Sequence, residues 1–305
     1  TLAPCASAAS VVAAPMDGWW DMPRDDFAGL LAFVEDDVTD VPSRVLWVGD
    51  TELVPGGDGW DLDDRLSYTA STSAVPGVAD LWPATSRGAS TRLGQALDLA
   101  LDHETTRLGR LLAPMGVQYV AVPQRLAPSD ETPRAAPRDR AADELIGVLA
   151  EQLDLQQLRV DRGLVLYRNT AFASLRSVAP EPAALGVTTV AGMGTVDLSG
   201  SEPVLTASDG ADEAQGVVPG GETVVQGSSA SDNWRLSVAG REAEHRSAYG
   251  WADAFEVDGG GQGVLVYRTP VGVRLLAAVQ AVLWLLALGV ALRMRFGAGD
   301  PPPAR

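Results

Sequence analysis

Residues 275–292 read LLAAVQAVLWLLALGVAL, an apolar run that only Gln280 interrupts. A bilayer core about 30 Å thick is crossed by roughly 20 predominantly apolar residues in an α-helix. A helix buried in a soluble core usually keeps a polar face, and one glutamine does not provide such a face. The run therefore predicts a transmembrane helix, which we place at 269–296, with a short tail at 297–305.

Arginines flank this run unequally. Arg293, Arg295 and Arg305 follow it, whereas Arg268 and Arg274 precede it. Short cytoplasmic segments carry an excess of Lys and Arg, so this bias places the C-terminus in the cytoplasm. We therefore expect a protein of the cell membrane whose residues 1–270 are extracytoplasmic.

The composition excludes several classes of function. The 305 residues carry a formal charge of −17, and nothing basic is clustered, which argues against a nucleic-acid partner. One cysteine, Cys5, excludes an internal disulfide. Two distant histidines, His103 and His245, disfavour a catalytic zinc or a Ser-His-Asp site, so we expect no cofactor. All 23 basic residues other than histidine are arginine, a pattern typical of a GC-rich bacterial genome.

The chain starts at Thr1 rather than Met, and residues 1–22 are rich in small apolar side chains. We expect the chain to be part of a longer protein. The segment 1–22 is then a linker that contains the end of a preceding membrane helix or the remainder of a signal sequence.

Residues 23–175 alternate between helical and buried-strand patterns. The run 44–50 (RVLWVGD) is apolar and ends at Gly-Asp, which is typical of a buried parallel strand. Apolar side chains at helical spacing predict helices at 23–38, 89–112 and 141–153, and further strands follow at 116–123, 155–160 and 163–168. Helices that alternate with strands indicate a small α/β domain, which we expect to be Rossmann-like.

Residues 176–268 differ from the preceding segment in amino-acid composition and in apolar pattern. Gly, Ser, Thr and Val predominate, and short apolar runs alternate with turns. Short strands at regular spacing predict an antiparallel β-sandwich. The predicted strands are 187–190, 204–207, 222–226, 234–238, 254–257 and 263–267.

Three phrases carry a resemblance to a known family: RVLWVGD at 44–50 with Trp60 and LWP at 81–83 downstream; TRLGRLLAPMGVQYVAVP at 106–123; and DNWRLSVAGR at 232–241, followed by YGWADAF at 249–255 and YRTP at 267–270. Together they resemble the C-terminal extracytoplasmic region of actinobacterial multi-span membrane glycosyltransferases, in which a family 2 transferase domain is fused to a polytopic membrane part.

The third phrase is also similar to the β domain of YfhO-type bacterial membrane proteins, although Ala239 stands where those domains often have Asp and Asn233 where they often have Gly. The resemblance implies sugar transfer during the assembly of cell-envelope polysaccharide. It also implies that the catalytic parts lie outside this chain, because neither the nucleotide-binding domain nor the early membrane loop of such enzymes is present.

Two groups of side chains are candidates for ligand binding. Asp61 and Asp63 form an Asp-x-Asp triplet that could hold Mg²⁺ or Mn²⁺, although we favour a solvated acidic turn as its explanation. Trp234, Tyr249 and Trp251, with Asp253 beside them, could stack on and hydrogen-bond to a sugar. The alternative, which we favour, is that these aromatics form the sandwich core or a membrane-interface belt.

Two remaining motifs contain the histidines. Asp102, His103 and Glu104 are predicted to lie in mid-helix, where consecutive residues do not face one another, so an exposed polar face explains them better than a general base. His245 stands among charged residues and is expected on a hairpin surface.

The sequence thus favours a non-catalytic region that shapes the acceptor side of a membrane glycosyltransferase. Its partners would be the membrane, the remainder of the polytopic enzyme, and a glycan or polyprenyl-linked sugar. Two alternatives stay open. One is a stand-alone anchored surface protein that binds polysaccharide or a protein partner; the other is an anchored hydrolase, which needs two carboxylates about 5–10 Å apart in one cleft.

Overall fold

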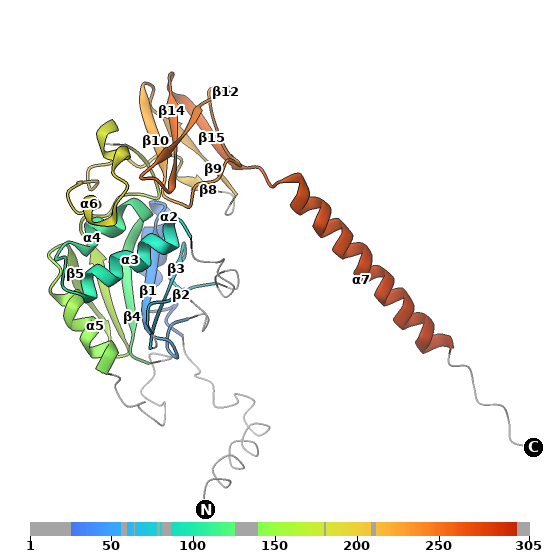
Figure 1. Ribbon diagram of the computed structural model, residues 1–305, viewed down its shortest axis with the longest axis horizontal. Helices are drawn as coiled ribbons and strands as arrows, with labels where there is room; N and C mark the ends of the chain where they lie inside the picture. Colours follow the sequence, from blue (N-terminus) through green and yellow to red (C-terminus); the bar gives the residue numbers. More distant parts are fainter. Residues whose placement is uncertain are drawn as a thin grey trace, which may run out of the picture.

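The computed structural model describes residues 26–55, 60–63, 65–77, 80, 87–125, 140–179, 181–208 and 212–297, without the side chains of 140, 182, 183, 208 and 291–297. The described chain is a mixed α/β structure with three sheets and one C-terminal apolar helix, α7 (Val271–Gly297), which projects away from the globular part (Figure 1). The predicted segment 1–22 lies outside the described residues, as does the predicted tail except for Gly297.

The first sheet has six strands in the order β2-β3-β1-β4-β6-β5. Their bounds are β1 (Arg44–Asp50), β2 (Trp60–Asp61), β3 (Leu66–Ser71), β4 (Val117–Pro123), β5 (Leu155–Asp161) and β6 (Leu164–Asn169). Only β1 and β4 pair in parallel, and the other four pairs are antiparallel. The Rossmann-like expectation is therefore not confirmed. Strands that follow one another through a short turn, as β5 and β6 do, must run in opposite directions.

Both faces of this sheet are covered, which explains the continuous apolar run in β1. Leu46 and Val48 belong to one buried cluster with three helices, whereas Val45 and Trp47 belong to a second cluster with α2 on the opposite face. The first cluster contains residues of α3 (Ala89–Leu101), α4 (Leu108–Leu112) and α5 (Arg140–Ala150); α2 spans Ala32–Asp40.

The predicted helix 89–112 is two helices. α3 ends at Leu101, and His103 has a φ of +56°, which a continuing α-helix cannot accommodate. Asp102, His103 and Glu104 therefore lie in the turn before α4 rather than in mid-helix. A 3₁₀ turn, η2 (Ala113–Met115), follows α4 and ends at Gly116, whose φ is +70°.

The remaining two sheets are antiparallel throughout, with strand orders β13-β14-β10-β7 and β12-β11-β15-β9-β8. A third buried cluster takes side chains from both of them, including Phe255 of β14 and Leu236 of β11. The strands are β7 (Arg176–Val178), β8 (Ala207–Ser208), β9 (Glu213–Val218), β10 (Glu222–Gln226), β11 (Trp234–Val238), β12 (Arg241–Glu242), β13 (Glu244–Ala248), β14 (Ala252–Val257) and β15 (Gly261–Tyr267).

The four-stranded sheet also packs against the first part of the chain. Alternation along β14 directs Phe255 and Val257 into the third cluster and places Ala252 and Ala254 in the first cluster, with α3 and α4. The segment before β8 adds η3 (Pro182–Gly186) and α6 (Val190–Met193) to this junction. The strand predicted at 187–190 is therefore wrong, because Thr189 caps a short helix there, its side chain accepting a bond from the Gly192 N–H at 3.2 Å.

Candidate functional site

The aromatic side chains proposed to stack on sugars are buried. Trp234 is 8% exposed and packs edge-on against Tyr267 at 5.2 Å between ring centroids. Tyr249 and Trp251 are 2% and 7% exposed and belong to the cluster that joins the β sheets to α4 and α6. Stacking on a sugar would require these rings to be uncovered. In this structure Trp234 packs between the two β sheets, whereas Tyr249 and Trp251 hold the β sheets against the first part of the globular body.

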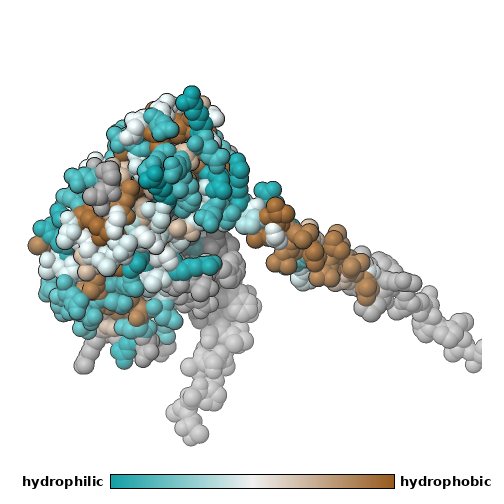
Figure 2. Space-filling view, turned by 45° about the horizontal axis from the view of Figure 1, so that its top comes forward, coloured by the Kyte–Doolittle hydropathy of each residue, from teal (hydrophilic) through white to brown (hydrophobic). Residues whose placement is uncertain are grey.

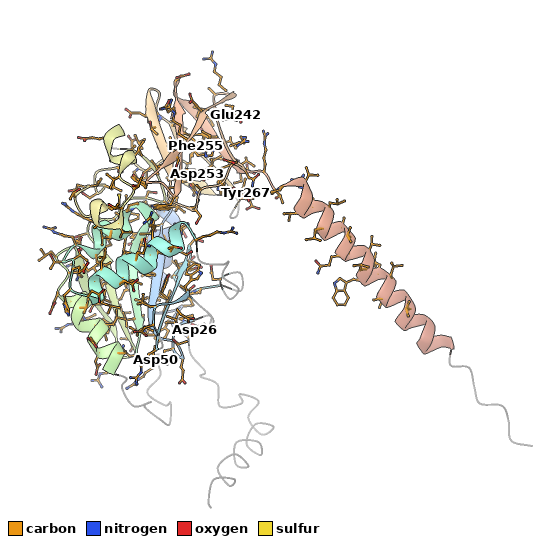
Figure 3. All side chains as sticks on the ribbon, in the orientation of Figure 1. Asp26, Asp50, Glu242, Asp253, Phe255 and Tyr267 are labelled. Atoms are coloured by element: carbon orange, nitrogen blue, oxygen red, sulfur yellow. The ribbon has the colours of Figure 1, made fainter. Side chains whose placement is uncertain are left out.

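Asp253 lies on β14 beside Phe255 and is 1% exposed (Figure 3). Its Oδ1 is 2.6 Å from Nε2 of His245, and the backbone N–H of Ser231 donates to both carboxylate oxygens at 3.2 Å. Burial raises the pKa of the Asp253 carboxyl, whereas the bonds from His245 and Ser231 act in the opposite direction. Asp253 therefore belongs to an interior polar cluster rather than to an open binding surface.

His245 is half-buried rather than a freely exposed hairpin residue. Its side chain is 24% exposed, and its ring stacks on Phe255 at 5.0 Å between centroids and 22° between planes. A buried carboxylate that orients an imidazole is two thirds of a nucleophilic triad. Within the described part of the chain, however, His245 has no hydrogen bond to a hydroxyl or thiol, so the pair lacks a nucleophile.

The polar cluster around Asp253 continues toward the start of α7. The amide of Asn233 donates to the Ser231 hydroxyl at 3.2 Å and to the Tyr267 hydroxyl at 3.3 Å, and the Arg268 N–H donates to the Asn233 carbonyl at 2.9 Å. Tyr267 ends β15, and α7 begins at Val271. The cluster thus ties the last strand firmly to the β11 side of the sheet immediately before the apolar helix.

The two aspartates proposed as metal ligands lie in and after the short strand β2. Asp61 is exposed, and Oδ1 of Asp63 accepts bonds from the N–H groups of Arg65 and Leu66, both at 2.7 Å. This pattern is that of an Asp side chain that stabilises its own turn. Among the described residues, no three His, Cys, Asp or Glu side chains are grouped so that they could hold a metal ion.

An acidic hollow of about 350 Å³ lies between the β11–β12 turn and the loop that follows β14. Glu242, one of its lining residues, lies at the end of the β sheets away from Tyr267 (Figure 3). Arginines already neutralise part of the lining: Arg235 Nε is 3.1 Å from Glu242, and Arg246 Nη1 is 2.6 Å from Glu256. Acidic residues that line the hollow therefore already form ion pairs at the surface of the protein.

The predicted transmembrane run forms most of α7. The window Val271–Val290 has a mean hydropathy of 2.1, and none of it is buried against the rest of the protein. Figure 2 shows the described part of this helix in brown, whereas the globular part is largely teal and white. Among the described residues, α7 is the one helix long and apolar enough to span a membrane.

No protein-family model matches the chain, and neither a curated protein nor a solved structure does. What bears on function is therefore the chemistry of the residues above: an interior Asp-His pair without a nucleophile, covered aromatics, and an uncovered apolar helix.

Proposed function

We propose that this chain is a membrane-anchored, non-catalytic globular region of a cell-envelope glycosyltransferase, with the globular part outside the cytoplasm. The observation that carries the anchoring is α7, whose apolar window is long enough to span and is entirely uncovered. An uncovered apolar surface of this size is unfavourable in water, so a bilayer is its natural surrounding.

The proposed non-catalytic character is supported by the hydrogen bonds of the candidate catalytic and metal-binding side chains among the described residues. The Asp253–His245 pair has no bound nucleophile, and Asp63 is engaged in its own turn. The link to sugar transfer depends on the three phrases that resemble membrane glycosyltransferases. In this proposal the six-stranded sheet and the two-sheet β region, arranged as a sandwich, form a scaffold beside the membrane part of the enzyme and shape its acceptor side.

A stand-alone anchored surface protein that binds polysaccharide or a protein partner is the second candidate. It is favoured by the finding that a single helix in the described part of the chain could span a membrane. An anchor of one helix needs no other membrane part to hold the globular region at the bilayer.

Removal of α7 tests the anchoring. We expect the full chain to stay in bacterial membranes through carbonate extraction, and a chain that ends at Pro270 to be soluble. Because α7 is not buried against the globular part, the shortened chain should keep its free energy of unfolding within about 0.5 kcal/mol. An extractable full chain, or a shortened chain that fails to fold, would argue against this role of α7.

The side of the membrane is tested by labelling. In a Cys5→Ser background, Leu153→Cys places a thiol at a side chain that is 69% exposed. An impermeant maleimide should label it in intact cells. Labelling only after permeabilisation would place the globular part in the cytoplasm.

The two candidates differ in their dependence on other parts of the native protein. Deletion of 26–268 from the native gene, with all membrane segments retained, should reduce transfer of sugar to envelope polysaccharide in isolated membranes if this region shapes an acceptor site. Unchanged transfer would favour the stand-alone binding protein.

A further inference from the structure

Arg176 is a buried cation that forms no ion pair within the described part of the chain. It is the first residue of β7 and is 7% exposed, and its Nε is fully covered with no hydrogen-bond acceptor. Within the described part of the chain, no carboxylate forms an ion pair with it and no carbonyl accepts from its guanidinium. Buried charges in proteins are normally paired, because an unpaired one is costly to remove from water.

Two more buried polar groups lack partners, and one of them lies opposite Arg176. Gln226 of β10 lies directly opposite Arg176 in the sheet, so both side chains leave the same face; it is 4% exposed, and its Oε1 has no donor. Ser228 follows, its N–H donating to the Gln226 carbonyl at 2.8 Å, and its hydroxyl is also buried without a partner. A guanidinium and an amide therefore lie side by side without satisfied hydrogen bonds, and Asp253 of β14 continues this row on the other side of Gln226.

A second arginine, Arg44, lies at the start of β1 in the six-stranded sheet. Nη1 of Arg44 donates to the carbonyls of Met115 at 2.6 Å and Gly227 at 2.7 Å, and Gly227 lies between Gln226 and Ser228. Burial and repulsion from Arg176 lower the pKa of Arg44 to about 10, and burial lowers that of Arg176 to about 10. Both side chains remain protonated at neutral pH, so two positive charges meet at this junction in a protein of net charge −17.

We propose that Arg176, with Gln226 beside it, Ser228 two residues further along the chain and Arg44 behind the Gly227 carbonyl, binds a small tetrahedral oxyanion of the phosphate class. The planar guanidinium fork matches two oxygens of such an anion. The Gln226 amide can rotate to donate through its nitrogen, and the Ser228 hydroxyl can donate a third bond. Because Arg176 is so little exposed, the anion is inorganic phosphate or a terminal phosphate monoester that enters at the edge of the sheet.

The test is titration of the full chain, solubilised in a non-ionic detergent, with inorganic phosphate by isothermal calorimetry, at an ionic strength held constant with chloride. We expect saturable binding in the wild type and at least tenfold weaker binding in Arg176→Met. The control is Arg246→Met, which removes an exposed arginine already paired with Glu244 and Glu256 and should bind like the wild type.

If Arg176→Met does not fold, Gln226→Met tests the same site, because it keeps the length of the side chain and removes the amide; it should weaken binding at least threefold. Dihexanoyl phosphatidic acid in a parallel titration distinguishes the source of the anion: binding that Arg176→Met or Gln226→Met weakens would assign the site to a lipid phosphate monoester. The proposal is overturned if neither phosphate compound binds the wild type, or if Arg246→Met weakens binding as much as the site variants do.

Discussion

At the scale of single residues, the carboxyl of Asp253 is a buried titratable group whose pKa is shifted by its surroundings. It is almost fully buried, shares a hydrogen bond with the His245 ring and accepts one from the Ser231 N–H. Its pKa is raised, chiefly by burial, so the folded protein holds the proton on Asp253 more tightly than the unfolded chain does. A raised carboxyl pKa makes stability depend on pH in a definite direction.

Asp253→Asn should remove this dependence. Since the folded pKa exceeds the unfolded one, the wild type loses stability as the pH rises from the ordinary carboxyl value of about 3.9 through the raised folded value. The free energy of unfolding of the wild type, measured by urea titration across this window, should fall relative to that of the Asn variant. Asp258→Asn, a change at an exposed loop carboxylate, serves as the control and should follow the wild type. If the free energies of unfolding of the wild type and of Asp253→Asn changed in parallel with pH, the raised pKa of Asp253 would be contradicted.

The sequence alone predicted part of this residue-level picture. Period-two alternation in 249–255 places Asp253 and Phe255 on one face, and the choice of core over surface for the aromatics agrees with their burial. The pairing of Asp253 with His245 depends on the register of β13 against β14. Likewise, Arg176 and Gln226 lie opposite each other because β7 pairs with β10, a strand about 50 residues further along the chain. Local sequence patterns do not specify such a pairing.

At the scale of elements, α4 is fixed by side chains from a distant segment. The carboxylate of Asp154 accepts bonds from the N–H groups of Gly109 and Arg110, both at 2.9 Å, and Oε1 of Gln152 accepts from the Leu108 N–H at 3.0 Å. These acceptors satisfy the free donors of the first helical turn, which no local capping residue does.

Gly109→Ala tests the close approach on which this arrangement depends. A Cβ at this position would lie 2.3 Å from Oδ1 of Asn169 and 2.8 Å from Cγ of Asp154. We expect a loss of about 1–3 kcal/mol in the free energy of unfolding, measured by chemical denaturation. Gly147→Ala in α5 is the matched control: nothing lies within 4 Å of its Cβ, and it should stabilise the protein by up to about 1 kcal/mol. Equal effects at the two glycines would count against the close contact.

Elements with strong patterns were predicted well, and those with weak patterns were not. The continuous apolar run 44–50 coincides with β1, because burial on both faces leaves no room for polar alternation. The same run could not reveal which neighbouring strands run parallel to β1, because strand direction depends on the length of the chain segments that connect the strands. The break at His103 was missed because Leu108 and Leu111 continue the helical spacing of α3 by coincidence, across a turn.

At the scale of the whole molecule, the globular part has a continuous interior. One buried cluster extends from the six-stranded sheet through α3 and α4 to β14, so the two predicted domains share a packed junction. Neither periodicity nor composition identifies which surface of a sheet will be covered by another part of the chain. The role of Tyr249 and Trp251 in this junction therefore could not be derived from the sequence.

Trp251→Ala should destabilise both parts of the globular body together. The ring is 7% exposed at the junction, so its removal leaves a cavity that costs about 3–5 kcal/mol. Hydrogen exchange should show loss of protection in the six-stranded sheet as well as in the β sheets. The control Leu153→Ala, at an exposed side chain, should change the free energy of unfolding by less than about 0.5 kcal/mol. Loss of protection confined to the β sheets would show that the two parts unfold independently.

The connection between β15 and α7 consists of residues 268–270, and its first residue is hydrogen-bonded to Asn233. Three residues reach at most about 11 Å when fully extended. The globular part therefore stays within about 11 Å of the start of α7. If α7 spans the membrane, as we propose, the globular part is held beside the bilayer, and a partner carried in the same membrane would be found by a two-dimensional search.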